Sequence, residues 1–173
     1  ESCPDTRLVY GTSPVILEKA VKTPSETDFL RQTYVDDGIA VERFLYWLEH
    51  EVAARGEVSE WEASERLTAL RAEIPGYRGN SFENISGYGP NAALPHYSTP
   101  ATGSAVIRPQ GLYLVDSGGQ YLTGTTDITR TVPMGECTPL EKEDYTLVLK
   151  GMIALSMAVF PRGTAGCQLD VLA

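Results

Sequence analysis

Residues 111–132 read GLYLVDSGGQYLTGTTDITRTV and contain the strongest structural signals of the chain. The apolar run 112–115 predicts a buried strand, and the alternating polarity of residues 126–132 predicts a second strand. Glycines between the two runs supply the backbone freedom that a turn needs. The segment therefore predicts a hairpin with its tip near residues 121–124.

The predicted hairpin carries two aspartates, Asp116 and Asp127, eleven residues apart. A tip at residues 121–124 places them roughly opposite each other on one face, where cross-strand Cβ atoms lie about 4.5–5.5 Å apart. Two like charges at that separation destabilise a hairpin unless something neutralises them. Carboxylates bind hard divalent cations such as manganese, so the pair indicates a metal site. Outside this context, aspartates beside Gly and Thr more often form turns with their own backbone.

Two blocks of the sequence resemble a known enzyme family. The first is DSGGQY at residues 116–121, followed by GTTDITRT at residues 124–131. The second is GYGPNAALPHY at residues 87–97, and it contains His96, twenty residues before Asp116. Both blocks resemble the catalytic domain of the pita-bread metallopeptidases, a family that includes methionine aminopeptidase, prolidase, creatinase and the Xaa-Pro aminopeptidases.

The resemblance implies an α+β fold, the first half of a pita-bread fold, with helices packed on a curved antiparallel sheet. Residues 1–20 would be the end of a preceding domain or a linker, and residues 21–173 the N-terminal half of the catalytic domain. The family's metal centre uses two aspartates, a later histidine and two later glutamates. Both histidines of this chain, His50 and His96, precede Asp127, so the chain is expected to be an inactive fragment without the C-terminal half.

The resemblance also implies a function. It implies a metallo-aminopeptidase that releases the N-terminal residue from peptides with proline at the second position. A hydroxide shared by two metal ions would attack the scissile carbonyl. Asp116 and Asp127 would bind the ions, with manganese expected and zinc or cobalt as alternatives. His96 would contact the substrate and the developing oxyanion.

Alternatives to this activity stay open at the level of sequence. Prolidase shares the hairpin and the histidine but cleaves Xaa-Pro dipeptides. A non-catalytic pita-bread module that binds a protein partner is the rival from another class, although the chain keeps both aspartates. The resemblance is also compatible with a homodimer, and exposed apolar surface on a half domain predicts self-association.

Composition excludes several other classes. The net charge of −9 argues against a nucleic-acid partner, because phosphate recognition needs a basic surface. The sequence shows no signal peptide, no basic run for a membrane surface and no apolar run of membrane-spanning length. Cys3, Cys137 and Cys167 lack metal-binding spacing and fit free thiols in a reducing compartment. Together these features predict a cytoplasmic protein.

Three capping boxes predict where helices begin. They start at Thr23, Ser59 and Thr138, each followed three residues later by Glu. The first helix is expected to run to Gly56, with Gly38 as a weak point inside it, and the second to about residue 72. The third helix is expected to pack a broad apolar face into a core, formed by Leu147, Val148, Met152, Ile153, Leu155 and Phe160.

Shorter strands are expected at residues 15–17, 81–88 and 104–106. His50 lies in the first helix and receives no functional role, because no motif surrounds it.

Overall fold

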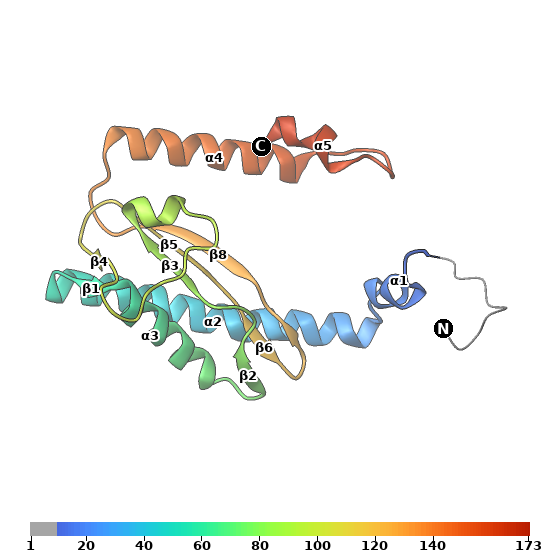
Figure 1. Ribbon diagram of the computed structural model, residues 1–173, viewed down its shortest axis with the longest axis horizontal. Helices are drawn as coiled ribbons and strands as arrows, with labels where there is room; N and C mark the ends of the chain where they lie inside the picture. Colours follow the sequence, from blue (N-terminus) through green and yellow to red (C-terminus); the bar gives the residue numbers. More distant parts are fainter. Residues whose placement is uncertain (1–9) are drawn as a thin grey trace.

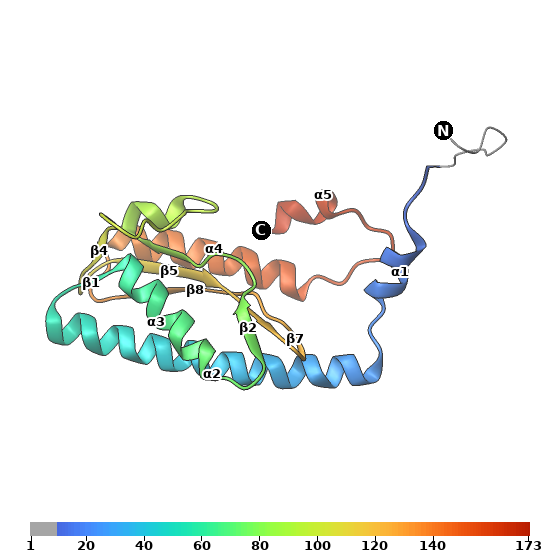
Figure 2. The same ribbon diagram turned by 60° about the horizontal axis from the view of Figure 1, so that its bottom comes forward.

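The computed structural model describes residues 10–173 and places helices on both sides of a small antiparallel sheet (Figure 1). The long helices α2 (Pro24–Arg55) and α3 (Glu60–Ala72) pack together on one side. Helix α4 (Pro139–Met157) lies on the opposite side, as Figure 2 also shows. The shorter helical elements are α1 (Pro14–Ala20), η1 (Gly89–Ala93), α5 (Gly166–Leu169) and η2 (Asp170–Leu172).

The strands form three sheets with the orders β1–β4, β2–β6–β7 and β3–β5–β8, and every pairing between named strands is antiparallel. Their bounds are β1 (Val58–Ser59), β2 (Tyr77–Asn80), β3 (Ile85–Tyr88), β4 (Val106–Ile107), β5 (Leu112–Ser117), β6 (Gly119–Tyr121), β7 (Gly124–Thr125) and β8 (Ile128–Pro133). Helices and antiparallel sheets together confirm the expected α+β class.

The predicted hairpin is confirmed and runs through two of these sheets. β5 pairs with β8, and β6 pairs with β7 in the same register, so the four strands are the two arms of one hairpin. Its last pair is Tyr121 with Gly124, which places the tip where the glycines and the polarity pattern predicted it.

The core lies between the helices α2 and α3 and one face of the β3–β5–β8 sheet. Along β5 buried residues alternate with half-buried ones, as expected for a strand with one covered face. Tyr113 and Val115 from the covered face pack with apolar residues of both helices, among them Phe44, Leu48 and Leu67. This packing holds β5, and with it the segment that carries Asp116.

Local capping explains where the helices begin. The complete capping boxes predicted at Thr23 and Thr138 are both present. Ser59 also caps its helix, but Glu62 bonds Arg55 at 2.6 Å instead of returning to the Ser59 backbone. Gly56 ends α2 with a φ of 79°, a left-handed conformation that glycine adopts without strain.

The prediction that the third helix buries its apolar face is wrong for the described chain. No residue of α4 is buried, and the expected core positions, including Met152 and Ile153, are exposed. A hydrophobic pattern indicates which face of a helix has to be covered, whereas the covering surface must come from another element. The apolar exposure expected for a half domain is thus confirmed, and self-association stays a prediction.

Two strand predictions need correction and one needs a shift. Residues 15–17 lie in helix α1, which Pro14 opens at a position where proline favours helix formation. Of residues 81–88, only the part from Ile85 is a strand, and Asn84 before it donates from its side chain to the carbonyl and hydroxyl of Ser64. The strand expected at 104–106 is β4 and begins at Val106.

The thiols predicted to be free are free where the structure describes them, with Cys137 buried and Cys167 exposed. Cys3 lies outside the described residues. Across residues 10–173, no helix combines the length and the apolar character needed to span a bilayer.

Candidate metal centre

Asp116 lies near the end of β5, on the sheet face turned away from α2 and α3. It is half-buried, whereas its neighbours Val115 and Ser117 are buried on the covered face. Thr129 stands directly opposite on β8, and its hydroxyl donates a hydrogen bond to Asp116 Oδ1 at 2.7 Å. Thr129 therefore orients one oxygen of the carboxylate and leaves the group at the surface of the sheet.

Asp127 lies one residue before β8, and the register places it across from Gly118. The expectation that the two aspartates lie opposite each other is therefore wrong by two residues, because Thr129 occupies that position. Residues two apart along an extended chain point to the same side, so Asp127 is a diagonal neighbour of Asp116. Diagonal neighbours are typically about 7–8 Å apart, which relieves the direct repulsion between the two carboxylates.

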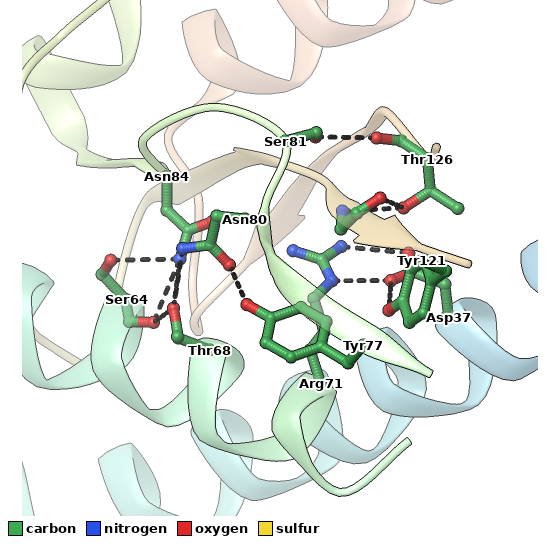
Figure 3. Close-up of polar contacts among 11 residues, drawn as sticks. Asp37, Ser64, Thr68, Arg71, Tyr77, Asn80, Ser81, Asn84, Tyr121 and Thr126 are labelled. Atoms are coloured by element: carbon green, nitrogen blue, oxygen red, sulfur yellow. Dashed lines mark hydrogen bonds and ion pairs between the residues drawn. The ribbon is translucent and has the colours of Figure 1, made fainter. Parts of the chain in front are cut away.

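The hairpin crosses from one sheet to the next at Gly118. A Cβ atom at this residue would meet the carbonyl oxygen of Thr126 and the hydroxyl of Ser81. Ser81 Oγ donates to that carbonyl at 2.9 Å (Figure 3). The Gly119 amide donates to Thr126 Oγ1 at 2.9 Å. These bonds hold Thr126, the residue before Asp127, and so they fix the position of the Asp127 backbone relative to the strands.

His96 lies in the loop after η1, with its side chain exposed. Its φ of 55° is left-handed, and it is the only residue other than glycine with positive φ among the described residues. It lines a shallow pocket of about 280 Å³ together with Asp116 and Thr129. The structure thus brings together two of the three predicted site residues, whereas Asp127 does not line this pocket.

Two residues of this region were missed by sequence reasoning. Thr129 lies inside the motif, and the correct hairpin register would have placed it beside Asp116. Glu60 is fully buried at the start of α3 and binds the loop that carries His96, but its partners lie 28 to 45 residues away in sequence. No local signal indicates such contacts. His50, as expected, is exposed on α2 and its Nδ1 lies 2.7 Å from the Tyr46 carbonyl oxygen.

Tyr97 follows His96 and donates a hydrogen bond to Glu60 at 2.9 Å. Loss of solvent, this bond and the nearby carboxylate charge raise the pKa of Tyr97 to about 12. The pKa of a tyrosine in an unfolded chain is about 10. The stability that the protonated Tyr97 contributes is therefore complete below about pH 10 and is lost as pH rises through about 12.

We therefore expect the free energy of unfolding to fall between about pH 10 and 12. Chemical denaturation at several pH values measures this slope. Burial also raises the pKa of Tyr113 and Tyr121, so Tyr97→Phe should reduce the slope without abolishing it. An unchanged slope in that variant would contradict the role assigned to Tyr97.

The donor set fits part of a site for a hard divalent metal. Asp116 and Asp127 offer carboxylate oxygens from one side of the hairpin, and such oxygens suit manganese and related ions. Within residues 10–173, no group of three or more His, Cys, Asp and Glu side chains could hold a metal ion. Two carboxylates are fewer ligands than a tight site for such an ion needs, so the described residues alone do not complete one.

Comparison with known proteins identifies relatives of the chain. It matches the metallopeptidase family M24 over residues 30–173. A probable Xaa-Pro aminopeptidase P from Tuber melanosporum is 47% identical over 169 residues, which cover 98% of this chain and 27% of that protein. The chain therefore spans about a quarter of the length of such curated relatives.

Solved structures show the same fold. An X-prolyl aminopeptidase from Caenorhabditis elegans, described as a cytosolic enzyme with a di-nuclear active site, superposes with a TM-score of 0.86 at 38% identity. The match covers 93% of this chain and 26% of that one. An Xaa-Pro dipeptidase from Bacillus anthracis superposes with a TM-score of 0.73 at 30% identity. This match covers 92% of the present chain and 42% of the dipeptidase chain. The chain belongs to the metallopeptidase family M24, and its fold matches part of the pita-bread fold of X-prolyl aminopeptidase structures.

Proposed function

We propose that this chain supplies part of the catalytic site of an Xaa-Pro aminopeptidase, which releases the N-terminal residue from peptides with proline at the second position. The observation that carries the proposal is the shared pocket of His96 and Asp116 beside the hairpin. Relatives named Xaa-Pro aminopeptidase support the substrate class. A cytoplasmic location goes with the proposal, because the C. elegans relative is described as cytosolic.

The proposed roles follow from the position of each side chain. Asp116 and Asp127 would hold two divalent ions, with manganese preferred and zinc or cobalt as alternatives. When bound, such ions act as Lewis acids on a peptide carbonyl and activate water. Thr129 keeps Asp116 oriented, and His96 donates a hydrogen bond to the carbonyl oxygen of the substrate as negative charge develops on it.

We further propose that residues 21–173 correspond to the N-terminal half of the catalytic domain, and residues 1–20 to the end of a preceding domain or a linker. The exposed apolar face of α4 supports the first of these assignments, because the other half of the domain would cover it. The 173-residue chain on its own is proposed to be inactive, since two carboxylates cannot fix a dinuclear centre.

A second candidate is prolidase, which is favoured by the likeness to the Bacillus anthracis dipeptidase. The non-catalytic binding module is disfavoured, because Asp116 and Asp127 are both present and Thr129 holds the first of them in place. Substrate length separates the two peptidases, since only an aminopeptidase cleaves Xaa-Pro peptides longer than two residues.

The first test is a calorimetric titration of the 173-residue chain with manganese, beside Asp116→Ala and Asp127→Ala. We expect weak binding that either substitution abolishes, because both carboxylates contribute and no third ligand is present among the described residues. Asp28→Ala serves as the matched control, since this exposed aspartate pairs only with Arg31. Tight binding of two ions would contradict the proposal that the isolated chain is incomplete.

The second test assays the polypeptide as its gene encodes it. Release of the first residue from an Xaa-Pro-Xaa tripeptide is expected, and we expect Asp116→Ala and Asp127→Ala to lower kcat/KM by at least about 10²-fold. If only the Xaa-Pro dipeptide is cleaved, the enzyme is a prolidase and the proposed activity is wrong. Full activity in both variants would show that neither aspartate is needed for catalysis.

A further inference from the structure

A buried carboxylate outside the candidate metal centre holds the loop that presents His96. Glu60 is the first residue of α3, and its side chain is fully buried. Its Oε1 accepts hydrogen bonds from the Tyr88 amide at 2.7 Å and from Asn91 Nδ2 at 3.0 Å. Its Oε2 accepts from the Tyr97 hydroxyl at 2.9 Å and from the Ala105 amide at 3.2 Å.

Four hydrogen-bond donors surround the buried carboxylate of Glu60. A buried charge is costly unless hydrogen bonds replace its hydration, and four donors do so here. The position in the first turn of a 13-residue helix adds the favourable field of the helix dipole. Within residues 10–173, Glu60 forms no ion pair, so these four hydrogen bonds are its side-chain polar contacts in the described chain.

The four donors bracket the segment that carries His96. Tyr88 precedes η1, Asn91 lies within it, and Tyr97 follows His96 directly. His96 itself has the left-handed φ of 55°, a conformation that is unfavourable for a residue with a side chain. Such a conformation persists where the surrounding structure determines it, and Glu60 holds the chain on both sides of it.

We propose that Glu60 is a positioning residue that fixes the His96 loop over the Asp116 pocket. The catalytic value of that placement rests on the proposed function, whereas the placement itself can be measured without any activity. Glu60 contacts neither the pocket nor its aspartate, so it acts only through the loop.

Glu60→Gln is the informative substitution, because it keeps the shape and removes one acceptor oxygen. Each carboxylate oxygen receives one backbone amide, from Tyr88 or from Ala105. Whichever way the new amide turns, its NH₂ group faces one of these N–H donors and cannot accept from it. The variant therefore loses the hydrogen bond to the Tyr88 amide or to the Ala105 amide and leaves that buried N–H donor without an acceptor.

The experiment measures the NMR order parameter of the His96 main-chain amide in the folded chain. In the native protein we expect a value of about 0.85, typical of rigid backbone, and in Glu60→Gln a fall below about 0.6. Order parameters in α3 and β5 should stay unchanged. Glu62→Gln is the matched control, because this partly exposed glutamate of the same helix pairs with Arg55 and should leave His96 ordered.

A milder variant keeps the test decisive if Glu60→Gln does not fold. Tyr97→Phe removes one of the four donors, and we expect an intermediate order parameter at His96. A rigid His96 in a folded Glu60→Gln variant would overturn the proposal. A low order parameter at His96 in the native chain would also overturn it. If Glu60→Gln does not fold, an unchanged order parameter at His96 in Tyr97→Phe would overturn the proposal instead.

An activity measurement separates this inference from the proposed function. In the peptidase that contains this sequence, Glu60→Gln should lower kcat/KM by about 10²-fold, the effect expected when a substrate-contacting group is misplaced by about 1 Å. Loss of order at His96 with full activity would confirm the positioning role and remove His96 from the catalytic proposal.

Discussion

Replacing Asp37 by alanine is expected to lower the free energy of unfolding by about 3–5 kcal/mol, the largest single effect that we expect on stability. Asp37 in α2 and Arg71 in α3 are both fully buried and form the one buried ion pair among the described residues. Without the carboxylate, a guanidinium charge remains in the core with nothing to neutralise it. Chemical denaturation of the two proteins measures the difference.

The geometry around Asp37 explains the size of this effect. Arg71 Nε donates to Asp37 Oδ1 at 2.7 Å and Arg71 Nη2 to Oδ2 at 3.0 Å, a two-pronged contact that binds strongly (Figure 3). The Tyr121 hydroxyl donates to the same Oδ1 at 2.5 Å. Arg71 Nη1 already lacks a partner among residues 10–173. Loss of Asp37 would therefore also release Tyr121, which is part of the hairpin that carries Asp127.

An exposed ion pair between the same two helices provides the control. Arg43 of α2 and Glu73 at the end of α3 form a contact of 2.8 Å, but both side chains are about half exposed. Glu73→Ala should change stability by less than about 1 kcal/mol, because water screens the charges in both states. Equal effects of Asp37→Ala and Glu73→Ala would contradict the argument from burial. The double variant Asp37→Leu with Arg71→Met should recover much of the loss.

Gly118→Ala is the second substitution with a large expected effect, a loss of about 3 kcal/mol in the free energy of unfolding. The added methyl group would meet the Thr126 carbonyl oxygen and the Ser81 hydroxyl, which are bonded to each other. One of these atoms belongs to the backbone between β7 and β8, on the other arm of the hairpin, so the clash cannot be relieved by a side-chain rotation. The strands must separate, and Asp127 moves with them.

Gly38→Ala is the matched glycine substitution and should act in the opposite direction. No atom lies within 4 Å of a Cβ placed on Gly38, which stands in the interior of α2. Alanine there should raise the free energy of unfolding by about 0.5–1 kcal/mol, because it restricts the unfolded chain without a clash. Denaturation curves measure both variants, and manganese titration should show weaker binding only for Gly118→Ala. Similar effects of the two substitutions would contradict the assigned clash.

Local chemistry made much of the fold predictable from the sequence. Thr23 and Thr138 start helices through bonds to residues three positions away, and Gly56 ends one through its own φ. The hairpin tip likewise depends on a few neighbouring residues. These elements are determined by contacts within a few residues, so a single sequence contains the information that specifies them.

Predictions that depended on what lies against an element were less successful. The face of α4 was expected to be buried from its apolar pattern, and within the described chain it is exposed. The two aspartates were expected to face each other. The observed register is shifted by two residues and places Thr129, not Asp127, opposite Asp116. Neither the covering of a helix nor the register of a ladder follows from the residues of one segment alone.

The family motif, the hairpin and the residues proposed to bind metal could all be recognised in the sequence. The orientation of Asp116 by Thr129, and the pocket that Asp116 shares with His96, became apparent in the folded chain. So did the burial of Glu60 beneath the His96 loop. These contacts join segments up to 45 residues apart, and their proximity depends on how the helices pack against the sheet.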